Sequence, residues 1–390
     1  MIRNPETFRE RFRIDVRTGH EVVAIDPAGH RVLARRLADG LERWEPFDQL
    51  LIATGAVPYV PDLAGAGARG IFGVNTLQQG VEIRRFIEEE RPQRGVIVGG
   101  GYIGLEMAEA LIRQGLGVTL VDRQPQVMGT LDPDMGALVA EALRGIGVTI
   151  HLGEPLVGFE TTGGRVTGVV TGERTLPADL VVLGMGVRPN SRLAREAGIP
   201  LGEKESIRVN GRMETEVAGV WAAGDCAESF HLVSRRPFYV ALGTVANKHG
   251  RVAGINISGG NALFGGVVGT AITKVCDLEV ARSGLHEKEL AGLGIDYATA
   301  RIESRTHAGY YPGVGPITVK LLAEKGSGRL LGGQIVGTQG AGKRIDIVAV
   351  SLHAGLTVAQ VSDLDLAYAP PFSPVWDPVA IAARETTKLV

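Results

Sequence analysis

Short apolar runs and amphipathic stretches alternate along much of the chain. The clearest run, Val96–Val98, leads into the glycine-rich Gly99–Gly104, and Leu105–Leu111 then carries apolar residues at helical spacing. Another apolar run, Val118–Asp122, follows. A short continuous apolar run predicts a strand buried on both faces, and apolar positions three and four apart predict an amphipathic helix. The pattern therefore predicts a β-α-β unit, which places this part of the chain in the α/β class.

Further apolar runs, each bounded by turn residues, predict short strands on both sides of this unit. They are Arg13–Val16, Glu21–Asp26, Gln49–Gly55, Val148–Leu152, a ribbon near Val166 to Val170, Leu180–Gly186 and Gly219–Ala227. Gly186–Asn190 is expected to form a sharp exit loop at the carboxyl end of the sheet, where ligands bind in open α/β folds.

The last third of the chain has a different pattern. A helix is expected through Leu242, Val245, Ala246, His249 and Val252. From about residue 264, strands at Gly269–Val275 and Ile317–Leu321 precede a helix from Lys343 to about Ala354. This section has no second glycine fingerprint, and it predicts an α+β module with apolar faces suited to assembly.

The glycines after Val98 match the dinucleotide fingerprint G-x-G-x-x-G. Gly99 suits the tight turn, Gly101 lets the backbone approach a pyrophosphate, and Gly104 lets the helix close on its strand. Asp122 ends the next strand at about the spacing where a carboxylate binds a ribose 2′-hydroxyl and repels a 2′-phosphate. The pattern favours NADH, although Arg123 beside it could accept NADPH. The alternative is a glycine turn without a ligand.

Length and charge narrow the class of protein. The 390 residues suggest two or three domains, and the 41 Lys+Arg and 43 Asp+Glu are nearly balanced. No basic run suggests nucleic acid or an anionic membrane, and no apolar stretch is long enough to span a bilayer. We therefore expect a cytoplasmic protein with small-molecule partners. The two cysteines, Cys226 and Cys276, form no C-x-x-C pair, so neither a metal site nor a disulfide framework is predicted.

Two strand ends suggest a second ligand site. Leu50–Gly55 ends in small residues, which suits a backbone that passes close to a cofactor, although an ordinary strand end explains it equally well. Asp225 follows another strand, where its carboxylate could accept a hydrogen bond from a polyol. The alternative for Asp225 is a helix cap or a turn former.

Four separated motifs occur in the order that is typical of the two-dinucleotide flavoprotein disulfide reductases. They are Ala53–Gly55, the Gly99 fingerprint, Gly186–Asn190 and Ala223–Asp225. Three C-terminal segments, His307–Gly313, Gly342–Asp346 and Ala367–Ser373, resemble coenzyme A disulfide reductases, in the branch that also holds NADH oxidases and NADH peroxidases. The resemblance covers essentially the whole chain.

This resemblance implies an α/β fold with two dinucleotide-binding, Rossmann-like domains, the first incomplete, and an α+β C-terminal dimerisation domain. The implied FAD domain comprises residues 1–76 and 191–263, the NAD(P)H domain residues 77–190, and the dimerisation domain residues 264–390 of a homodimer. Hydride would pass from NAD(P)H to FAD and electrons then to a cysteine. The implied acceptor is a small-molecule disulfide, coenzyme A disulfide or a coenzyme A persulfide or polysulfide.

Site residues are carried over by motif. The FAD residues would be Val22, Ala53, Thr54, Gly55, Asp225, Ala241 and Leu242. The nicotinamide nucleotide residues would be Gly99, Gly101, Tyr102, Ile103, Gly104, Glu106, Asp122 and Gly186. The resemblance also implies catalytic phenols at Tyr310 and Tyr368 and substrate contacts at Arg11 and Asn247. The alternative for Glu106 is a first-turn carboxylate favoured by the helix dipole, and for the tyrosines it is interface packing.

The chain departs from this family pattern in several places. The family's first G-x-G-x-x-G and its redox cysteine do not occur among these residues, and neither Cys226 nor Cys276 has the positive, accessible setting of a reactive thiol. Phe12 and Trp376 stand where similar members carry lysines suited to phosphate groups, although Arg11 and Arg13 could supply charge.

Three interpretations follow from these departures. One is a coenzyme A-dependent disulfide or persulfide reductase represented by a truncated chain, and this is the one we favour. Another is an NADH oxidase or peroxidase that reduces oxygen or peroxide. The last is a non-catalytic nucleotide-binding, dimerising module. We expect residues 1–390 alone to bind NADH, to hold FAD weakly and to reduce no disulfide.

Overall fold

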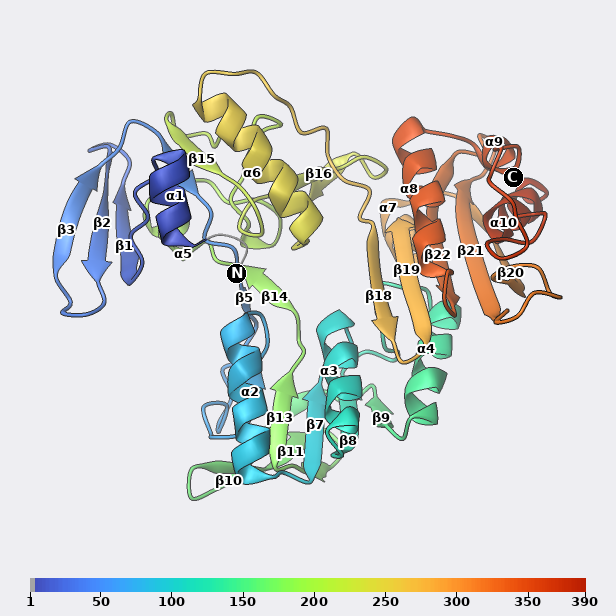
Figure 1. Ribbon diagram of the computed structural model, residues 1–390, viewed down its shortest axis with the longest axis horizontal. Helices are drawn as coiled ribbons and strands as arrows, with labels where there is room; N and C mark the ends of the chain where they lie inside the picture. The colour runs from blue at the N-terminus through green and yellow to red at the C-terminus, as the bar shows by residue number, and fades with distance from the viewer. Residues whose placement is uncertain (1–3) are drawn as a thin grey trace. The chain divides into compact units, whose positions relative to one another are not determined.

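The computed structural model describes residues 4–390, and contacts divide the chain into two compact units (Figure 1). The first unit comprises the residues up to Ala56, Arg188–Ser229 and Pro237–Gly265. The second comprises Val57–Val187, Phe230–Arg236 and Gly266–Val390. Each unit is therefore assembled from segments that are distant in the sequence.

The first unit begins with a short helix rather than the expected strand. Asn4 caps α1 (Pro5–Phe12) by accepting a hydrogen bond from the Thr7 N–H, and Pro5 occupies the first helical turn. Arg13 ends the helix in the left-handed region with φ 54°. The predicted strand Arg13–Val16 is therefore wrong, because Arg13 is a helix cap and the residues after it form no ladder.

Two small sheets form the frame of this unit. An antiparallel sheet has the order β1 (His20–Asp26), β2 (Arg31–Arg36), β3 (Glu42–Pro46). A parallel pair joins β4 (Leu50–Ile52) to β15 (Val220–Ala222), with Ile52 opposite Ala222. Because the two strands are parallel and in register, the residues that follow them leave the same edge of the pair.

Helices and a small core complete the first unit. Its remaining helices are α5 (Arg192–Glu196), a 3₁₀ turn (Glu203–Glu205) and α6 (Gly243–Ile257). Ile52, Ala194, Ile207 and Ala222 pack with Cys226 in a core whose members are all at most 4% exposed. The short strands β5 (Ala56–Pro58), β14 (Val187–Pro189), β16 (Ser229–His231) and β17 (Arg236–Phe238) fall where the chain passes between units. The predicted Gly186–Asn190 exit loop thus contains a short strand, β14.

A five-stranded parallel sheet organises the first half of the second unit (Figure 1). Its strand order is β6 (Ile71–Gly73), β13 (Leu180–Leu183), β7 (Arg94–Val98), β8 (Gly117–Asp122), β9 (Thr149–Leu152). Its helices are α2 (Leu77–Glu90), α3 (Tyr102–Arg113) and α4 (Pro133–Gly145). Val96–Val98 are buried as predicted, and Leu105, Ala108 and Leu111 form the buried face of α3. Burying each leucine contributes roughly 1.5–3 kcal/mol to folding.

An antiparallel ribbon is inserted in the sequence between β9 and β13 and forms a separate sheet, near the position where a ribbon was predicted. It consists of β10 (Leu156–Thr162), β11 (Arg165–Thr171) and β12 (Thr175–Pro177). β11 pairs with both neighbours.

The second half of this unit is a five-stranded antiparallel sheet with helices. Its strand order is β18 (Ala271–Val275), β19 (Leu278–Gly284), β22 (Leu330–Gly337), β21 (Pro316–Glu324), β20 (Tyr297–Arg305). Its helices are α7 (Glu287–Leu293), a 3₁₀ turn (Gly342–Arg344), α8 (Ile345–Ala354), α9 (Val358–Ser362) and α10 (Pro378–Thr387). This arrangement confirms the predicted α+β module and, with the parallel sheet, the predicted fold class.

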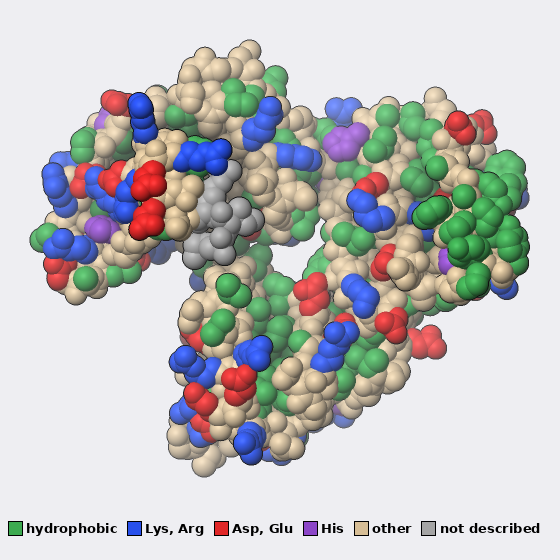
Figure 2. Space-filling model, viewed as in Figure 1, with side chains coloured by type: hydrophobic (Ala, Val, Ile, Leu, Met, Phe, Trp, Pro, Cys, Tyr) green, Lys and Arg blue, Asp and Glu red, His purple; other side chains and the backbone are tan. Residues whose placement is uncertain are grey.

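The two halves of the second unit share one core. Leu105 of α3 and Met135 of α4 belong to the same buried cluster as Val275, Val280 and Val336 of the C-terminal sheet. Hydrophobic side chains also gather at the surface over the C-terminal region (Figure 2). The exposed apolar residues of its loops include Tyr310, Tyr311, Phe372, Val375 and Trp376. In the described part of the chain, no helix is both long and apolar enough to cross a membrane.

Candidate functional site

In the glycine-rich turn between β7 and α3, some glycines are required by the packing of the fold and one is not. A Cβ on Gly99, whose φ is +106°, would lie 2.5 Å from the Gly184 carbonyl oxygen, and one on Gly104 would lie 1.9 Å from the Gly99 oxygen. A Cβ on Gly101 would meet nothing within 4 Å. The fold therefore requires the outer glycines, whereas only a ligand that approaches the backbone requires Gly101.

Asp122 is already held by the turn. Its Oδ2 accepts the Gly100 N–H at 2.6 Å and its Oδ1 accepts the Gln124 N–H at 2.8 Å. Each carboxylate oxygen keeps a second lone pair, so the side chain is fixed in place and still able to accept from a hydroxyl. Gly101 caps α3 without a side-chain hydrogen bond, which leaves the first N–H groups of the helix available to phosphate oxygens.

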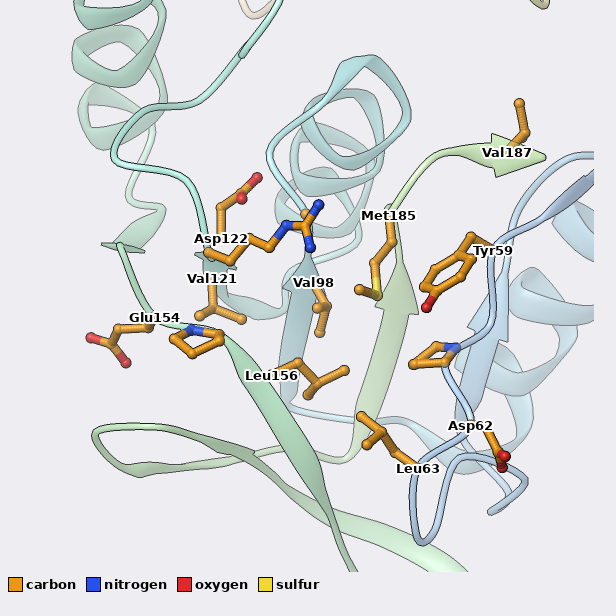
Figure 3. Close-up of a pocket in the computed structure, with 14 residues that line it drawn as sticks. Tyr59, Asp62, Leu63, Val98, Val121, Asp122, Glu154, Leu156, Met185 and Val187 are labelled. Atoms are coloured by element: carbon orange, nitrogen blue, oxygen red, sulfur yellow. The ribbon is translucent and has the colours of Figure 1, made fainter. Parts of the chain in front are cut away.

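A cavity of about 770 Å³ adjoins this turn, within the range of small-molecule sites (Figure 3). Val98 points into it from β7, and Met185 and Tyr59 face it from the segments after β13 and β5. Its other lining residues include Asp62, Leu63, Gly99, Val121, Asp122, Arg123, Glu154, Leu156 and Val187. The carbonyl oxygen of Gly186, a predicted nucleotide residue outside the lining, accepts the Tyr59 N–H at 2.9 Å.

Glu106 does not occupy the first turn of α3. The helix begins at Tyr102 and has no acidic residue in its first turn, so the helix-dipole interpretation of Glu106 is wrong. Its Oε1 instead accepts a hydrogen bond of 2.5 Å from the Thr273 hydroxyl on β18. The carboxylate is therefore tied to the C-terminal sheet. Tyr102 and Ile103, two of the predicted nucleotide residues, lie in the first turn of α3.

A second candidate site lies in the first unit, where the chain leaves β4 and β15. Thr54 donates to the Asn190 carbonyl at 2.5 Å, and Asn190 N–H donates to the Gly55 carbonyl at 2.9 Å, which fixes the small residues after β4. The Ala223 N–H donates to the Ile52 carbonyl oxygen at 3.0 Å. Ala53–Gly55 and Asp225 therefore follow the two strands at the same edge of the pair.

Asp225 and Tyr239 carry the clearest signal of a missing polar partner. The Asp225 Oδ1 and the Tyr239 hydroxyl are buried and have no hydrogen-bond partner among the described residues. Burial raises the pKa of Asp225. Burial, followed by the charges of Asp225 and Cys226, raises the pKa of Tyr239. Buried polar atoms are rarely left unpaired, so the two residues fit a ligand that supplies hydroxyl groups, such as the polyol chain of a flavin.

The remaining predicted residues of this unit are more dispersed. Leu242 caps α6 without a side-chain hydrogen bond, directly after Ala241, and the helix start is therefore open to an acceptor. Val22 lies in β1 and is 37% exposed. Asn247 bonds back to Gly243 within α6, and Arg11 lies over the Phe12 ring in α1. Asp225 does not cap α6, because Leu242 does.

The two predicted catalytic tyrosines meet on the C-terminal surface. Tyr310 lies between β20 and β21, and Tyr368 lies between α9 and α10. Hydrogen bonding with the neighbouring Tyr310 phenol, which favours the neutral Tyr368 hydroxyl, followed by burial, raises the pKa of Tyr368. Both rings are exposed, Tyr310 by 79% and Tyr368 by 46%. The backbones of the two loops are joined as well, because the Ala308 N–H donates to Pro370 at 3.1 Å.

The cysteines are not arranged as reactive thiols. Burial raises the pKa of both Cys226 and Cys276. The Cys226 thiol is 3.5 Å from the Ile52 carbonyl oxygen, to which it donates. Both therefore remain protonated thiols near neutral pH. In the described chain, residues 4–390, no cluster of histidine, cysteine or acidic side chains is suited to a metal.

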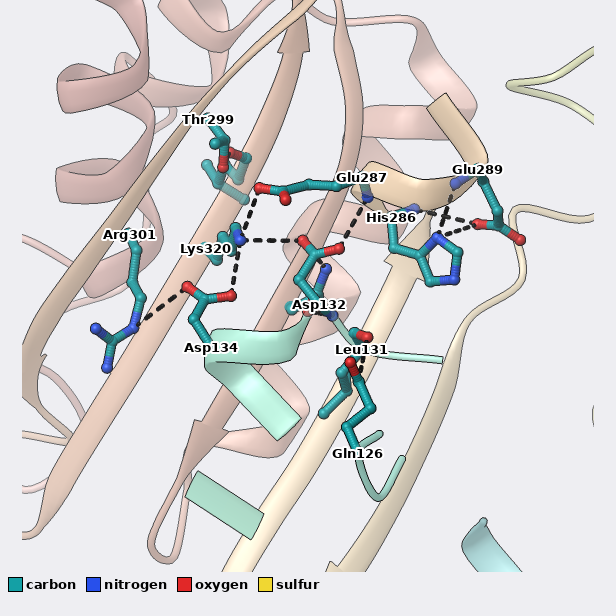
Figure 4. Close-up of polar contacts among 12 residues, drawn as sticks. Gln126, Leu131, Asp132, Asp134, His286, Glu287, Glu289, Thr299, Arg301 and Lys320 are labelled. Carbon is teal, nitrogen blue, oxygen red and sulfur yellow. Dashed lines mark hydrogen bonds and ion pairs between the residues drawn. The ribbon is translucent and has the colours of Figure 1, made fainter. Parts of the chain in front are cut away.

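A buried lysine that the sequence analysis missed joins the C-terminal sheet to the parallel-sheet half of the second unit, called the nucleotide half below (Figure 4). Lys320 is 4% exposed, and its Nζ lies 3.2 Å from Asp132, 2.8 Å from Asp134 and 2.8 Å from Glu287. Burial acts to lower the pKa of Lys320, but hydrogen bonds to Asp134 and Glu287 outweigh it and raise that pKa. Asp132 also accepts from Gln334 at 2.7 Å. The only sequence signal was a lysine within the apolar run Ile317–Leu321.

This geometry defines a class of protein: a parallel sheet with a dinucleotide fingerprint, fused to an antiparallel C-terminal module, and a second candidate ligand site within the other unit. Residues 3–254 match the family described as pyridine nucleotide-disulphide oxidoreductase, and residues 270–379 match its dimerisation domain. The chain therefore belongs to the pyridine nucleotide-disulphide oxidoreductase family. This membership confirms the predicted oxidoreductase that uses FAD and a nicotinamide nucleotide.

Individual members of the family are similar to this chain over most of its length. The chain is 41% identical to the "NAD(P)H sulfur oxidoreductase (CoA-dependent)" of Pyrococcus abyssi, over 97% of this chain and 84% of the relative. It is 34% identical to the NADH oxidase of Methanocaldococcus jannaschii, over 100% of this chain and 86% of the relative. Among solved structures, the NAD-dependent persulfide reductase from A. fulgidus has a TM-score of 0.95 at 38% identity, with 99% of this chain and 72% of that chain covered.

Proposed function

We propose that the protein is an FAD-dependent NAD(P)H:disulfide oxidoreductase that acts on coenzyme A disulfide or on a coenzyme A persulfide or polysulfide. The observation that carries this proposal is that the Tyr310 and Tyr368 phenols are neighbours at the surface, in loops that also expose Phe372 and Val375. A phenol can donate a proton to a departing thiolate. The names of the relatives above, coenzyme A-dependent sulfur oxidoreductase and persulfide reductase, support the acceptor class.

The nucleotide would bind at the Gly99 turn. Gly101 is the residue that only a ligand explains, and Asp122 is fixed where it can accept from a ribose hydroxyl. We propose that Gly99, Gly101, Tyr102, Ile103, Gly104 and Asp122 contact NAD(P)H. Arg123 lines the same cavity, so NADPH is proposed as a second donor.

The flavin would bind in the first unit, where Ala53–Gly55 and Asp225 leave the strand pair. Bound FAD supplies the step from two-electron hydride transfer to sulfur reduction. The chain's own contribution is to accept hydrogen bonds at Asp225 and to offer the Tyr239 phenol and the open start of α6. We propose residues 1–76 and 191–263 as the FAD domain, residues 77–190 as the NAD(P)H domain and residues 264–390 as the dimerisation domain.

A homodimer through residues 264–390 is part of the proposal. The match to the dimerisation domain covers residues 270–379. The exposed apolar side chains of this region, among them Phe372 at 76% and Val375 at 70% exposed, would be covered by a second copy. Neither Cys226 nor Cys276 is proposed as the redox sulfur.

The acceptor is tested with the flavin-loaded protein expressed from its complete gene. Turnover of NADH and NADPH is measured with coenzyme A disulfide, coenzyme A persulfide, polysulfide and oxygen as acceptors. The wild type should reduce a coenzyme A acceptor faster than oxygen. Tyr310→Phe and Tyr368→Phe should each lower that turnover by roughly 100-fold, in the range of general-acid catalysis, and leave oxygen consumption unchanged.

Tyr311→Phe is the matched control, because Tyr311 is an exposed neighbour whose ring packs on His307. It should keep full turnover. Oxygen consumption above disulfide turnover, with both tyrosine variants unaffected, would favour the second candidate, an NADH oxidase. That candidate has the Methanocaldococcus jannaschii relative in its support.

A further inference from the structure

A buried arginine lies beneath the two tyrosine loops. Arg344 ends the 3₁₀ turn Gly342–Arg344 and is 9% exposed. Its Nε donates to the Asp377 Oδ2 at 2.9 Å. Its Nη2 donates to the carbonyl oxygens of Thr306 at 2.6 Å and Phe372 at 2.7 Å, and its Nη1 donates to that of Gly340 at 2.5 Å. One guanidinium thus joins three separate segments of the chain.

Two of these segments carry the tyrosines. Thr306 opens the loop that contains Tyr310, and Phe372 lies in the segment that contains Tyr368. Neither stretch, 306–315 or 363–377, contains a helix or a strand. Their conformation therefore depends on individual hydrogen bonds, and Arg344 supplies one to each.

Asp377 connects this arginine to a rigid element. Its Oδ1 accepts the Val379 N–H at 2.8 Å and caps α10, while its Oδ2 also accepts from Ser373 at 3.2 Å. Asp377 is 8% exposed, so the pair with Arg344 is shielded from water. The contacts use the planar fork of arginine in several directions, which a lysine ammonium cannot reproduce.

We propose that Arg344 is a positioning residue that sets the geometry of the Tyr310–Tyr368 pair by holding the backbones of both loops. This inference rests on the proposed function of the two phenols. Arg344 hydrogen bonds to neither phenol in the structure, so its effect on turnover is indirect. A displacement of about 1 Å in such a pair can cost on the order of 100-fold in rate.

The test uses Arg344→Lys, which keeps the positive charge beside Asp377 and removes the fork. In the flavin-loaded protein, disulfide turnover at saturating NADH should fall roughly 10- to 100-fold. Reduction of ferricyanide by NADH, which needs the nucleotide and flavin sites but no phenol, should stay within about twofold of the wild type. Sedimentation and thermal melting establish that the variant is folded with unchanged assembly. Arg329→Lys, at the half-exposed pair with Glu324, is the matched control and should change neither activity.

A double-mutant comparison separates positioning from general weakening of the fold. In a Tyr368→Phe background, Arg344→Lys should lower disulfide turnover by less than about twofold, because the geometry it protects is already without function. A full additional 10-fold loss in that background would overturn the inference, as would a parallel loss of ferricyanide reduction. If the tyrosine variants themselves keep full disulfide turnover, the proposed function fails; if they lose it and Arg344→Lys does not, only the positioning role fails.

Discussion

Asp122 ends the parallel strand β8 and Asp225 follows the parallel strand β15, yet the two carboxylates have opposite hydrogen-bonding environments. Asp122 accepts two backbone N–H groups and closes its own turn. Asp225 has a buried oxygen without a partner among the described residues, and burial raises its pKa. The proposed nucleotide site around Asp122, called the nucleotide side below, is therefore complete in its internal contacts. The proposed flavin site around Asp225, called the flavin side, leaves the polar atoms of Asp225 and Tyr239 for a ligand to satisfy. Substitutions at the two sites should accordingly change different properties of the protein.

The largest effect is expected where the internal contacts of the nucleotide side are broken. Lys320→Met removes the ammonium that Asp132, Asp134 and Glu287 share, and among the described residues only Asp134 keeps another cation, Arg301 at 3.7 Å. The free energy of unfolding should fall by about 3–5 kcal/mol, measured by urea denaturation at pH 7. The pKa of Lys320 is raised above 10.5, so its contribution is fully present at that pH and is lost only as pH rises above 10.5 through the raised value.

Lys325→Met is the matched control for that experiment. Lys325 pairs with Asp296 at the surface, with 51% of the lysine side chain exposed. It should change stability by less than about 1 kcal/mol. Equal losses from the two lysines would contradict the view that the nucleotide half depends on the buried cluster.

A smaller effect, confined to binding, is expected at the middle glycine of the turn. Gly101→Ala has open space for its methyl group and should melt with the wild type, but NADH binding measured by calorimetry should weaken roughly 10- to 100-fold, or about 1.4–2.7 kcal/mol. Gly104→Ala should instead destabilise the fold, since its methyl would meet the Gly99 oxygen at 1.9 Å.

Gly145→Ala is the control for the effect of replacing any glycine by alanine. Gly145 lies in α4, and nothing is within 4 Å of the added Cβ. It should leave NADH affinity unchanged. Unchanged affinity in Gly101→Ala as well would mean that no ligand approaches the turn.

The smallest effect is a pH dependence on the flavin side. Because the pKa of Asp225 is raised from 3.8, the folded state holds its proton longer than the unfolded chain does, and stability falls as pH rises from 3.8 through the raised value. In flavin-free protein, Asp225→Asn should remove this fall of the free energy of unfolding with pH. Urea denaturation between about pH 4 and 7 measures it. Saturating FAD should suppress the slope in the wild type, because a ligand then satisfies the carboxylate.

Asp179→Asn provides a control of opposite sign. The hydrogen bond from Arg94 lowers the pKa of Asp179, so its stabilising contribution is present above 3.8 and is lost as pH falls through the lowered value. Asp179→Asn should therefore flatten a rise of the free energy of unfolding with pH. The same slope in both variants would show that the two carboxylates are not treated differently.

Local patterns predicted much of this fold. The buried strand before Gly99 and the face of α3 follow from continuous and helical apolar spacing, and the end of β8 at Asp122 follows from the same pattern. The strand expected at Arg13–Val16 failed because Asn4 and Pro5 begin a helix that ends at Arg13, and four residues carry too little periodicity to distinguish the two. The alternative that put Glu106 in the first turn of α3 failed because the apolar pattern does not fix where the helix starts.

The site residues that were missed depend on contacts between distant parts of the sequence. Tyr239 stands out only once its hydroxyl is seen buried near Asp225. Lys320 was visible as a lysine in an apolar strand, but its three acidic partners come from α4 and α7. Arg344 lies in the Gly342–Asp346 segment of the resemblance, but its bonds go mainly to backbone carbonyls, which leave no mark on residue type. No local motif encodes such contacts.

The core that α3 and α4 share with Val275, Val280 and Val336 has a practical consequence. A fragment cut before β18 would expose the apolar undersides of both helices to solvent, and should precipitate rather than fold. Limited proteolysis should accordingly release no soluble nucleotide-binding fragment, and hydrogen exchange should show the parallel sheet and β22 opening in a single step. Anyone wishing to graft this cofactor pocket onto another protein must transplant the antiparallel sheet with it.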